Sequence, residues 1–162
     1  IFNVAQVGTN QLPGCRFFGT QPGGNAGMKI SSAGDFNSDG FGDLLIVAPN
    51  ETKVLNGQLR RGVCYLVFGG YHLYNKVFQL TEVGTQQLPG VTFVSPYAMG
   101  TADEATIESA ESAGDVDGDG FGDILIGVPT ADYIYPASPT QRRIDSGEAY
   151  LVYGTSVSGV GN

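Results

Sequence analysis

Hydrophobic and polar positions along the chain change over short runs, with no sustained helical period. The β-rich runs Cys15–Thr20 and Val91–Pro96 each follow a Pro-Gly pair, which favours a turn that leads into a strand. Two other runs, Asp43–Ala48 and Asp123–Val128, are almost continuously apolar and end at a proline. Because a strand of this kind is buried on both faces, the pattern predicts an all-β protein in which sheets pack against sheets.

Three phrases occur twice along the chain. The pairs are FNVAQVGTNQLPG and FQLTEVGTQQLPG (from residues 2 and 78), SAGDFNSDGFGDLLIVAP and SAGDVDGDGFGDILIGVP (from residues 32 and 112), and GVCYLVFGG and GEAYLVYGT (from residues 62 and 147). The offset therefore grows from 76 to 80 to 85 residues, as expected when strands of fixed length are joined by loops of variable length. We predict two repeats, over residues 1–76 and 77–162.

Each repeat is expected to contain two strands besides those named above. One leads into an aspartate-rich loop, over Met28–Ala33 or Ala105–Ala113. The other is the run VCYLVFG or EAYLVYG, over Val63–Gly69 or Glu148–Gly154. The two repeats are thus predicted to be short antiparallel sheets of about four strands each.

The aspartate-rich loops place oxygen-bearing groups at alternate positions directly before the apolar strands. The candidate ligands are the side chains of Asp35, Asn37, Asp39 and Asp43 with the carbonyl of Phe41, and the side chains of Asp115, Asp117, Asp119 and Asp123 with the carbonyl of Phe121. Gly40 and Gly120 permit the tight curl that brings such oxygens to one point. Hard oxygen ligands at this density suit Ca²⁺, which accepts about six to eight of them, better than Mg²⁺. The spacing predicts two calcium sites.

Two other interpretations of these loops are weaker. An EF-hand would need a glutamate where Ile46 and Ile126 stand, and a helix where the apolar runs end at a proline. Aspartate and glycine are also ordinary turn residues, but ordinary turns do not require two copies with identical spacing. Without an ion, the crowded carboxylates would repel one another.

The charge of the chain agrees with the metal interpretation. The formal net charge is −8, and seven of the sixteen acidic residues are candidate calcium ligands. An acidic chain without clustered lysine and arginine is a poor nucleic-acid binder. No run approaches the roughly 18 apolar residues of a membrane-spanning helix. We expect neither nucleic-acid binding nor a membrane span.

These phrases resemble FG-GAP repeats, the blades of the β-propellers of integrin α-subunits. The resemblance rests on SAGDFNSDGFGD and SAGDVDGDGFGD, each followed by an apolar run and a proline, and on YLVFG and YLVYG. It implies antiparallel four-stranded blades in which a calcium loop joins the first two strands and the outermost strand comes last. Residues 28–96 would then form one complete blade, and residues 105–153 a blade that lacks its outer strand.

Cys15–Thr20 would be a spare outer strand without a blade of its own. A propeller needs about four to eight blades to close, so two blades close only within a larger array or by exchange of strands between copies. Either the chain is part of a longer array, or its spare strand completes the last blade of another copy, head to tail.

The cysteines leave two alternatives open. Cys15 falls in the spare outer strand, and Cys64 falls in the strand that an outer strand should pair with. A disulfide, within one chain or between copies, and a pair of buried thiols are both compatible with this placement.

Asn50 begins the glycosylation sequon Asn50-Glu51-Thr52, which together with calcium binding favours an extracellular, secreted protein.

The loop over residues 130–146 is a candidate ligand-binding loop. It contains Tyr133, Tyr135, Arg142 and Arg143. In FG-GAP repeats the loop after this strand emerges on the face where ligands dock, and tyrosine and arginine are favoured at binding hot spots. A solvated loop stiffened by its prolines is the alternative.

The sequence offers no catalytic set of residues. His72 is the single histidine, and we find neither a zinc motif nor a glycine-rich phosphate loop. We therefore expect a non-catalytic, calcium-stabilised extracellular adhesion or recognition module that binds protein or glycan. The alternatives are a structural subunit of an extracellular filament or ring assembled by strand donation, and an accessory repeat region of a larger secreted enzyme.

Overall fold

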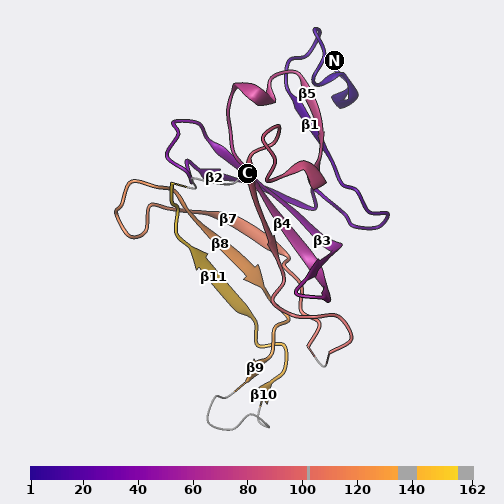
Figure 1. The fold of residues 1–162 in the computed structure, drawn as a ribbon, viewed down its shortest axis with the longest axis vertical. Coiled ribbons are helices and arrows are strands. Elements are labelled where there is room, and N and C mark those ends of the chain that lie inside the picture. The colour runs from indigo at the N-terminus through magenta and orange to yellow at the C-terminus, as the bar shows by residue number, and fades with distance from the viewer. Residues whose placement is uncertain (102, 135–141, 157–162) are drawn as a thin grey trace.

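Two antiparallel sheets contain most of the strand residues, and the first takes its last strand from the second predicted repeat (Figure 1). The computed structural model describes residues 1–101, 103–134 and 142–156. The first sheet has the strand order β2-β3-β4-β6 and consists of β2 (Lys29–Gly34), β3 (Asp43–Leu55), β4 (Gln58–Val67) and β6 (Gly90–Val94). The second has the order β11-β8-β7 and consists of β7 (Ser109–Gly114), β8 (Asp123–Val128) and β11 (Glu148–Val152). The all-β, blade-like prediction is confirmed.

The strand β3 is longer than the sequence predicts. It was expected to end before Pro49, but it continues to Leu55 and pairs with β4 on both sides of a register shift between Ala48 and Thr52. The shift accommodates the proline, which cannot donate to a ladder. Asn56 and Gly57, both with positive φ, close the two-residue turn between the strands. An Asn-Gly pair between apolar positions is a hairpin signal that our strand assignment did not use.

The segment before the first sheet is also ordered. The strand β1 (Cys15–Phe18) pairs in parallel with β5 (Lys76–Gln79), at the end of the molecule that carries the N terminus (Figure 1). One copy of the repeated phrase precedes β1, and the other begins at the end of β5. The two copies fold alike, each with a 3₁₀ turn, η1 (Val4–Gln6) and η3 (Leu80–Glu82). The spare strand therefore lies beside β5, a pairing that the sequence did not predict.

Two clusters of buried apolar side chains lie on opposite faces of the first sheet. The cluster between the sheets contains Ala33, Phe36, Leu45, Val47, Cys64, Leu66, Phe68, Ala105, Ile107, Ala110, Ile124, Ile126, Val128 and Ala131. The cluster beneath β1 and β5 contains Ile46, Ala48, Val63, Tyr65, Val67, Phe78, Leu80 and Leu88. We call the first the inter-sheet core and the second the outer core.

The structure separates the two cysteines, and both carry free thiols. Cys64 belongs to the inter-sheet core, whereas Cys15 packs against the outer core on the other face of the sheet. The residue opposite Cys64 on the neighbouring strand is Phe93, because β6 and not β1 pairs with β4. The two cysteines are therefore not linked to each other in this structure, and a disulfide between copies stays a prediction.

We expect a thiol reagent to modify Cys15 before Cys64 in the folded protein. Cys64 is fully buried, and burial raises the pKa of its thiol to about 12, so that almost no reactive thiolate is present near neutral pH. Cys15 is only half-buried. Time-resolved labelling should give one slow phase that a Cys15→Ser variant lacks, and a second phase only in denaturant. Labelling of Cys64 first would contradict this placement.

Within residues 1–101, 103–134 and 142–156, the structure contains no helix of the length and apolarity that a membrane span requires.

Candidate metal centre

Each aspartate-rich loop joins the first two strands of its sheet, and the two loops fold alike. In the first loop, the carboxylate of Asp35 accepts hydrogen bonds from the backbone N–H groups of Asp39 (3.0 Å) and Gly40 (2.9 Å). Asp39 in turn accepts a bond from the N–H of Phe41 at 2.9 Å. These bonds curl the loop around its first carboxylate. The glycine at the sixth position is needed because its φ is +88°.

The second loop repeats this arrangement. Asp115 accepts bonds from the N–H groups of Asp119 at 3.1 Å and Gly120 at 3.0 Å. The N–H of Phe121 donates to Asp119 at 2.9 Å, and the N–H of Asp119 also donates to Asp117 at 3.2 Å. Identical side-chain roles at identical positions show that the repeated spacing encodes one local structure.

The last aspartate of each loop is buried and ties the loop to a distant strand. Both oxygens of Asp43 accept backbone bonds, one from Phe36 in the loop and one from Gly69 after β4, each 2.8 Å long. In the second repeat, Asp123 accepts from Val116 at 2.7 Å and from Gly154 at 2.8 Å. These carboxylates therefore fix the position of each loop relative to the end of β4 in the first sheet and the end of β11 in the second.

The bonds from Gly69 to Asp43 and from Gly154 to Asp123 were not predicted from the sequence, although the sequence indicates them. Both repeats place a glycine directly after YLVF or YLVY. A Cβ added at Gly69 would lie 2.3 Å from the carbonyl oxygen of Gly42, and one at Gly154 would lie 2.5 Å from that of Gly122. These positions must be glycine because the loop backbone passes directly over them.

Three carboxylates of the second loop converge. Oxygens of Asp115, Asp117 and Asp123 lie within 4.8 Å of one another. The pKa of Asp117 is raised, first by desolvation and then by the nearby charges of Asp119 and Asp123. Such mutual repulsion is what a bound cation relieves. The donor set contains only oxygen, which fits a hard divalent cation.

The first loop has an amide at the corresponding place. Asn37 stands where the second loop has Asp117, and its side-chain N–H₂ donates to Asp39 at 2.9 Å. The pKa of Asp43 is raised, mainly by burial and further by the charges of Asp39 and Asp35. The two loops thus have oxygen-bearing side chains at the same sequence positions, but the first loop has three carboxylates and the second has four. The carbonyls of Phe41 and Phe121 stay predicted ligands.

The two loops also contact each other. The N–H of Gly122 in the second loop donates to the carbonyl oxygen of Asp35 at 2.8 Å. The N–H of Thr155, which follows β11, donates to the carbonyl oxygen of Phe36 in the first loop at 3.0 Å. Both candidate sites therefore lie side by side at one end of the packed sheets.

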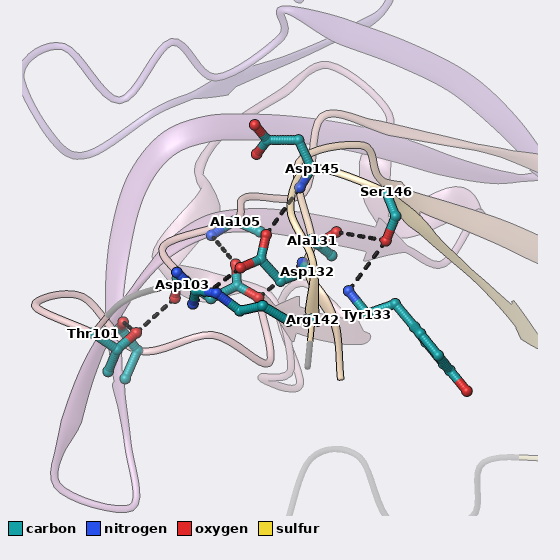
Figure 2. A network of polar contacts seen from close by, with 10 residues as sticks. Thr101, Asp103, Ala105, Ala131, Asp132, Tyr133, Arg142, Asp145 and Ser146 are labelled. Carbon is teal, nitrogen blue, oxygen red and sulfur yellow. Dashed lines mark hydrogen bonds and ion pairs between the residues drawn. The ribbon is translucent and has the colours of Figure 1, made fainter. Parts of the chain in front are cut away.

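The predicted ligand loop contains a different polar network, shown in Figure 2. Asp132 is buried, accepts a bond from the N–H of Asp145 at 2.9 Å and pairs with Nη1 of Arg142 at 3.1 Å. Asp103 accepts a bond from the N–H of Asp132 at 2.9 Å. Arg142 therefore anchors the base of the loop, an additional role that the sequence did not reveal.

The other predicted residues of this loop are placed as follows. Tyr133 lies in β9 (Tyr133–Ile134), opposite Arg143 of β10 (Arg142–Arg143), and both are exposed. Tyr135 lies outside the described residues. Asn50 is exposed on β3, as a glycosylation acceptor should be, while the next residue, Glu51, is buried and accepts a bond from the hydroxyl of Tyr65 at 2.5 Å.

Comparison with known proteins agrees with this geometry. The model of the FG-GAP repeat matches residues 26–60 and 109–152, each of which includes one aspartate-rich loop and the strands around it. Integrin alpha-PS5 of Drosophila melanogaster is 28% identical over 123 residues, which cover 74% of this chain and 10% of that protein. The chain thus spans about a tenth of the length of this relative. The chain carries two FG-GAP repeats, and its sequence is similar to part of an integrin α-subunit.

Proposed function

We propose that the chain is a non-catalytic, calcium-stabilised extracellular module that recognises a protein or glycan ligand. The observation that carries the proposal is the pair of aspartate-rich loops with matching hydrogen bonds. The similarity to an integrin α-subunit supports an extracellular location and a role in protein binding.

Calcium would stabilise the fold through these loops. The residues that would hold it are Asp35, Asn37, Asp39 and Asp43 in the first loop, and Asp115, Asp117, Asp119 and Asp123 in the second. The folded second loop brings three carboxylates together, and the first loop is curled by the same hydrogen bonds. The unfolded chain holds no such oxygens in place, so binding free energy would add to folding free energy. The pKa values of Asp43 and Asp117 are raised mainly by desolvation and further by neighbouring carboxylates, and the ion would offset this second, repulsive contribution.

The test is the double variant Asp39→Ala with Asp119→Ala. We expect calorimetry to detect two calcium ions per wild-type chain and a large loss of binding in the variant. Chelation should lower the melting temperature of the wild type but hardly change that of the variant. The matched control, Glu108→Ala with Glu111→Ala, removes the same charge at exposed positions outside the loops. Unchanged calcium binding and unchanged melting in the loop variant would show that the metal assignment is wrong.

The second site is expected to bind calcium more tightly than the first. It offers four carboxylates, whereas the first offers three and the amide of Asn37. Because affinity rises with ligand charge, we expect a difference on the order of tenfold. An Asn37→Asp variant should narrow the gap in a calcium titration, and a tighter first site in the wild type would contradict the argument.

The exposed side of the loop around β9 and β10 is the proposed ligand-binding surface. Tyr133 and Arg143 are exposed there, while the ion pair of Arg142 with Asp132 holds the loop in place.

A specific observation favours a second function as well, that of a structural subunit assembled by strand donation. The strand β11 pairs only with β8 in the described part of the chain.

A further inference from the structure

The two repeats can be compared strand by strand, because each phrase has its counterpart. The strand β4 of the first sheet corresponds to β11 of the second, at an offset of 85 residues. One edge of β4 pairs with β3 and the other with the outer strand β6. The strand β11 pairs with β8, and its other edge has no strand beside it in the described residues. The second sheet therefore offers an edge for one more antiparallel strand.

The strand β1 corresponds to the outer strand β6, at an offset of 76 residues. In the first sheet, Val91 and Phe93 of β6 pack on the inter-sheet core, against the second sheet. Their counterparts Cys15 and Phe17 pack in the same way on the outer core, against the first sheet. The strand β1 thus already lies where the outer strand of a preceding sheet would lie. With β5 on one edge, the other edge of β1 has no strand beside it in residues 1–101, 103–134 and 142–156.

The exposure of corresponding residues shows two half-interfaces. Leu45 and Leu66 are fully buried between the sheets, whereas their counterparts Leu125 and Leu151 are 45% and 38% exposed. These two leucines lie on the face of the second sheet that points away from the first. We call it the front face.

The other half-interface lies on the opposite side of the molecule. Ala110 and Ile124 of the second sheet are buried against the first sheet. Their counterparts on the first sheet, Ile30 and Leu44, are 68% and 38% exposed. They line an apolar groove together with Phe17 and Ile46. We call this surface of the first sheet the rear face.

We propose that a second copy of the chain docks head to tail, so that its β1 joins β11 of the first copy as the missing outer strand. The front face of one copy then packs on the rear face of the next, as the two sheets of one chain already pack on each other. The proposal rests on the second candidate function above and does not depend on calcium binding.

The pairing of β4 with β6 fixes the register of the new strand pair. Transferred residue by residue, the partners are Glu148 with Phe18, Ala149 with Phe17, Tyr150 with Arg16, Leu151 with Cys15 and Val152 with Gly14. Cys15 then lies opposite Leu151, on the face that packs against the next copy. Since each copy keeps one donor strand and one acceptor edge, the contact is heterologous and continues into a ring or a filament.

The register can be tested with the native cysteine. Residues directly opposite in an antiparallel pair have Cβ atoms about 4.5–5.5 Å apart, while diagonal neighbours are about 7–8 Å apart. A Leu151→Cys variant should therefore form disulfides with Cys15 of another copy under mild oxidation, and give a ladder of linked chains on a non-reducing gel. Ala149→Cys places its thiol on the same face but opposite Phe17, so its ladder should be at least tenfold weaker.

Two outcomes of this experiment would overturn the proposal. One is a Leu151→Cys chain that stays single after oxidation, and the other is an equal ladder from Ala149→Cys. In the background of Cys15→Ser, Leu151→Cys should form at most dimers. A ladder that persists there would show that the links do not use β1.

Sedimentation velocity tests the faces without any cross-link. We expect the average mass of the wild-type chain to rise with concentration, and Leu125→Lys to lower the association constant at least tenfold. Val54→Lys is the matched control, because Val54 is exposed on the hairpin of β3 and β4, away from both faces. A monomer at all concentrations, or equal effects of the two lysines, would refute the assembly. Calcium measured in the same samples decides the metal proposal separately.

Discussion

Replacing Asp123 with alanine is expected to lower the free energy of unfolding by about 1–4 kcal/mol even when no calcium is present. The carboxylate is fully buried and accepts the N–H groups of Val116 and Gly154. The bond from Gly154 is buried, and a buried donor that loses its partner costs about 1–3 kcal/mol; the bond from Val116 is partly buried, so its loss costs less. Urea denaturation in a chelator measures this structural part alone.

Asp117→Ala is the matched control for Asp123→Ala. Asp117 belongs to the same carboxylate cluster but is exposed, so its loss should affect stability mainly when calcium is present. At a calcium concentration a hundred times the dissociation constant, one lost site costs about 2.7 kcal/mol. Equal stabilities of the two variants in chelator would contradict the tie that we assign to Asp123.

A second large effect is expected for Leu45→Ala, whose counterpart variant is Leu125→Ala. Leu45 is fully buried between the sheets, and removing a buried leucine side chain costs about 2–5 kcal/mol. Leu125 occupies the same place in the second repeat but is 45% exposed, and an exposed substitution usually changes stability by about 0.5 kcal/mol or less. Denaturant unfolding in dilute solution should show this difference. Similar losses for both leucines would mean that the front face is already covered.

The sequence was sufficient for those features that depend on residues close together in the chain. The alternating oxygens and the glycine of each loop specify the curl by themselves, as the bonds to Asp35 and Asp115 show. The apolar runs predicted the positions of β3 and β8 correctly, but β8 is not buried on both faces as such a run suggests, because Leu125 is 45% exposed. Repetition supported both assignments, since the phrases recur with indels only between them.

Features that depend on distant contacts were missed. The pairing of β1 with β5 joins segments about 60 residues apart, and no local pattern encodes a partner at that distance. The same holds for Asp132, whose burial and pairing with Arg142 follow from how the loop folds back. The two cysteines were placed on the correct strands, but their separation depends on which strand occupies the edge of β4.

The backbone bonds between the two loops have a consequence for the shape of any array built from such sheets. The bonds from Gly122 to Asp35 and from Thr155 to Phe36 involve main-chain atoms alone. A Cβ on Gly122 would lie 3.1 Å from the carbonyl oxygen of Ala33, and one on Gly154 would lie 2.8 Å from that of Phe36, so the close approach depends on these two glycines. This main-chain joint and the inter-sheet core together hold successive sheets at one angle, which an array of such sheets would repeat as its curvature. Loop side chains that take part in neither contact can vary without bending the array.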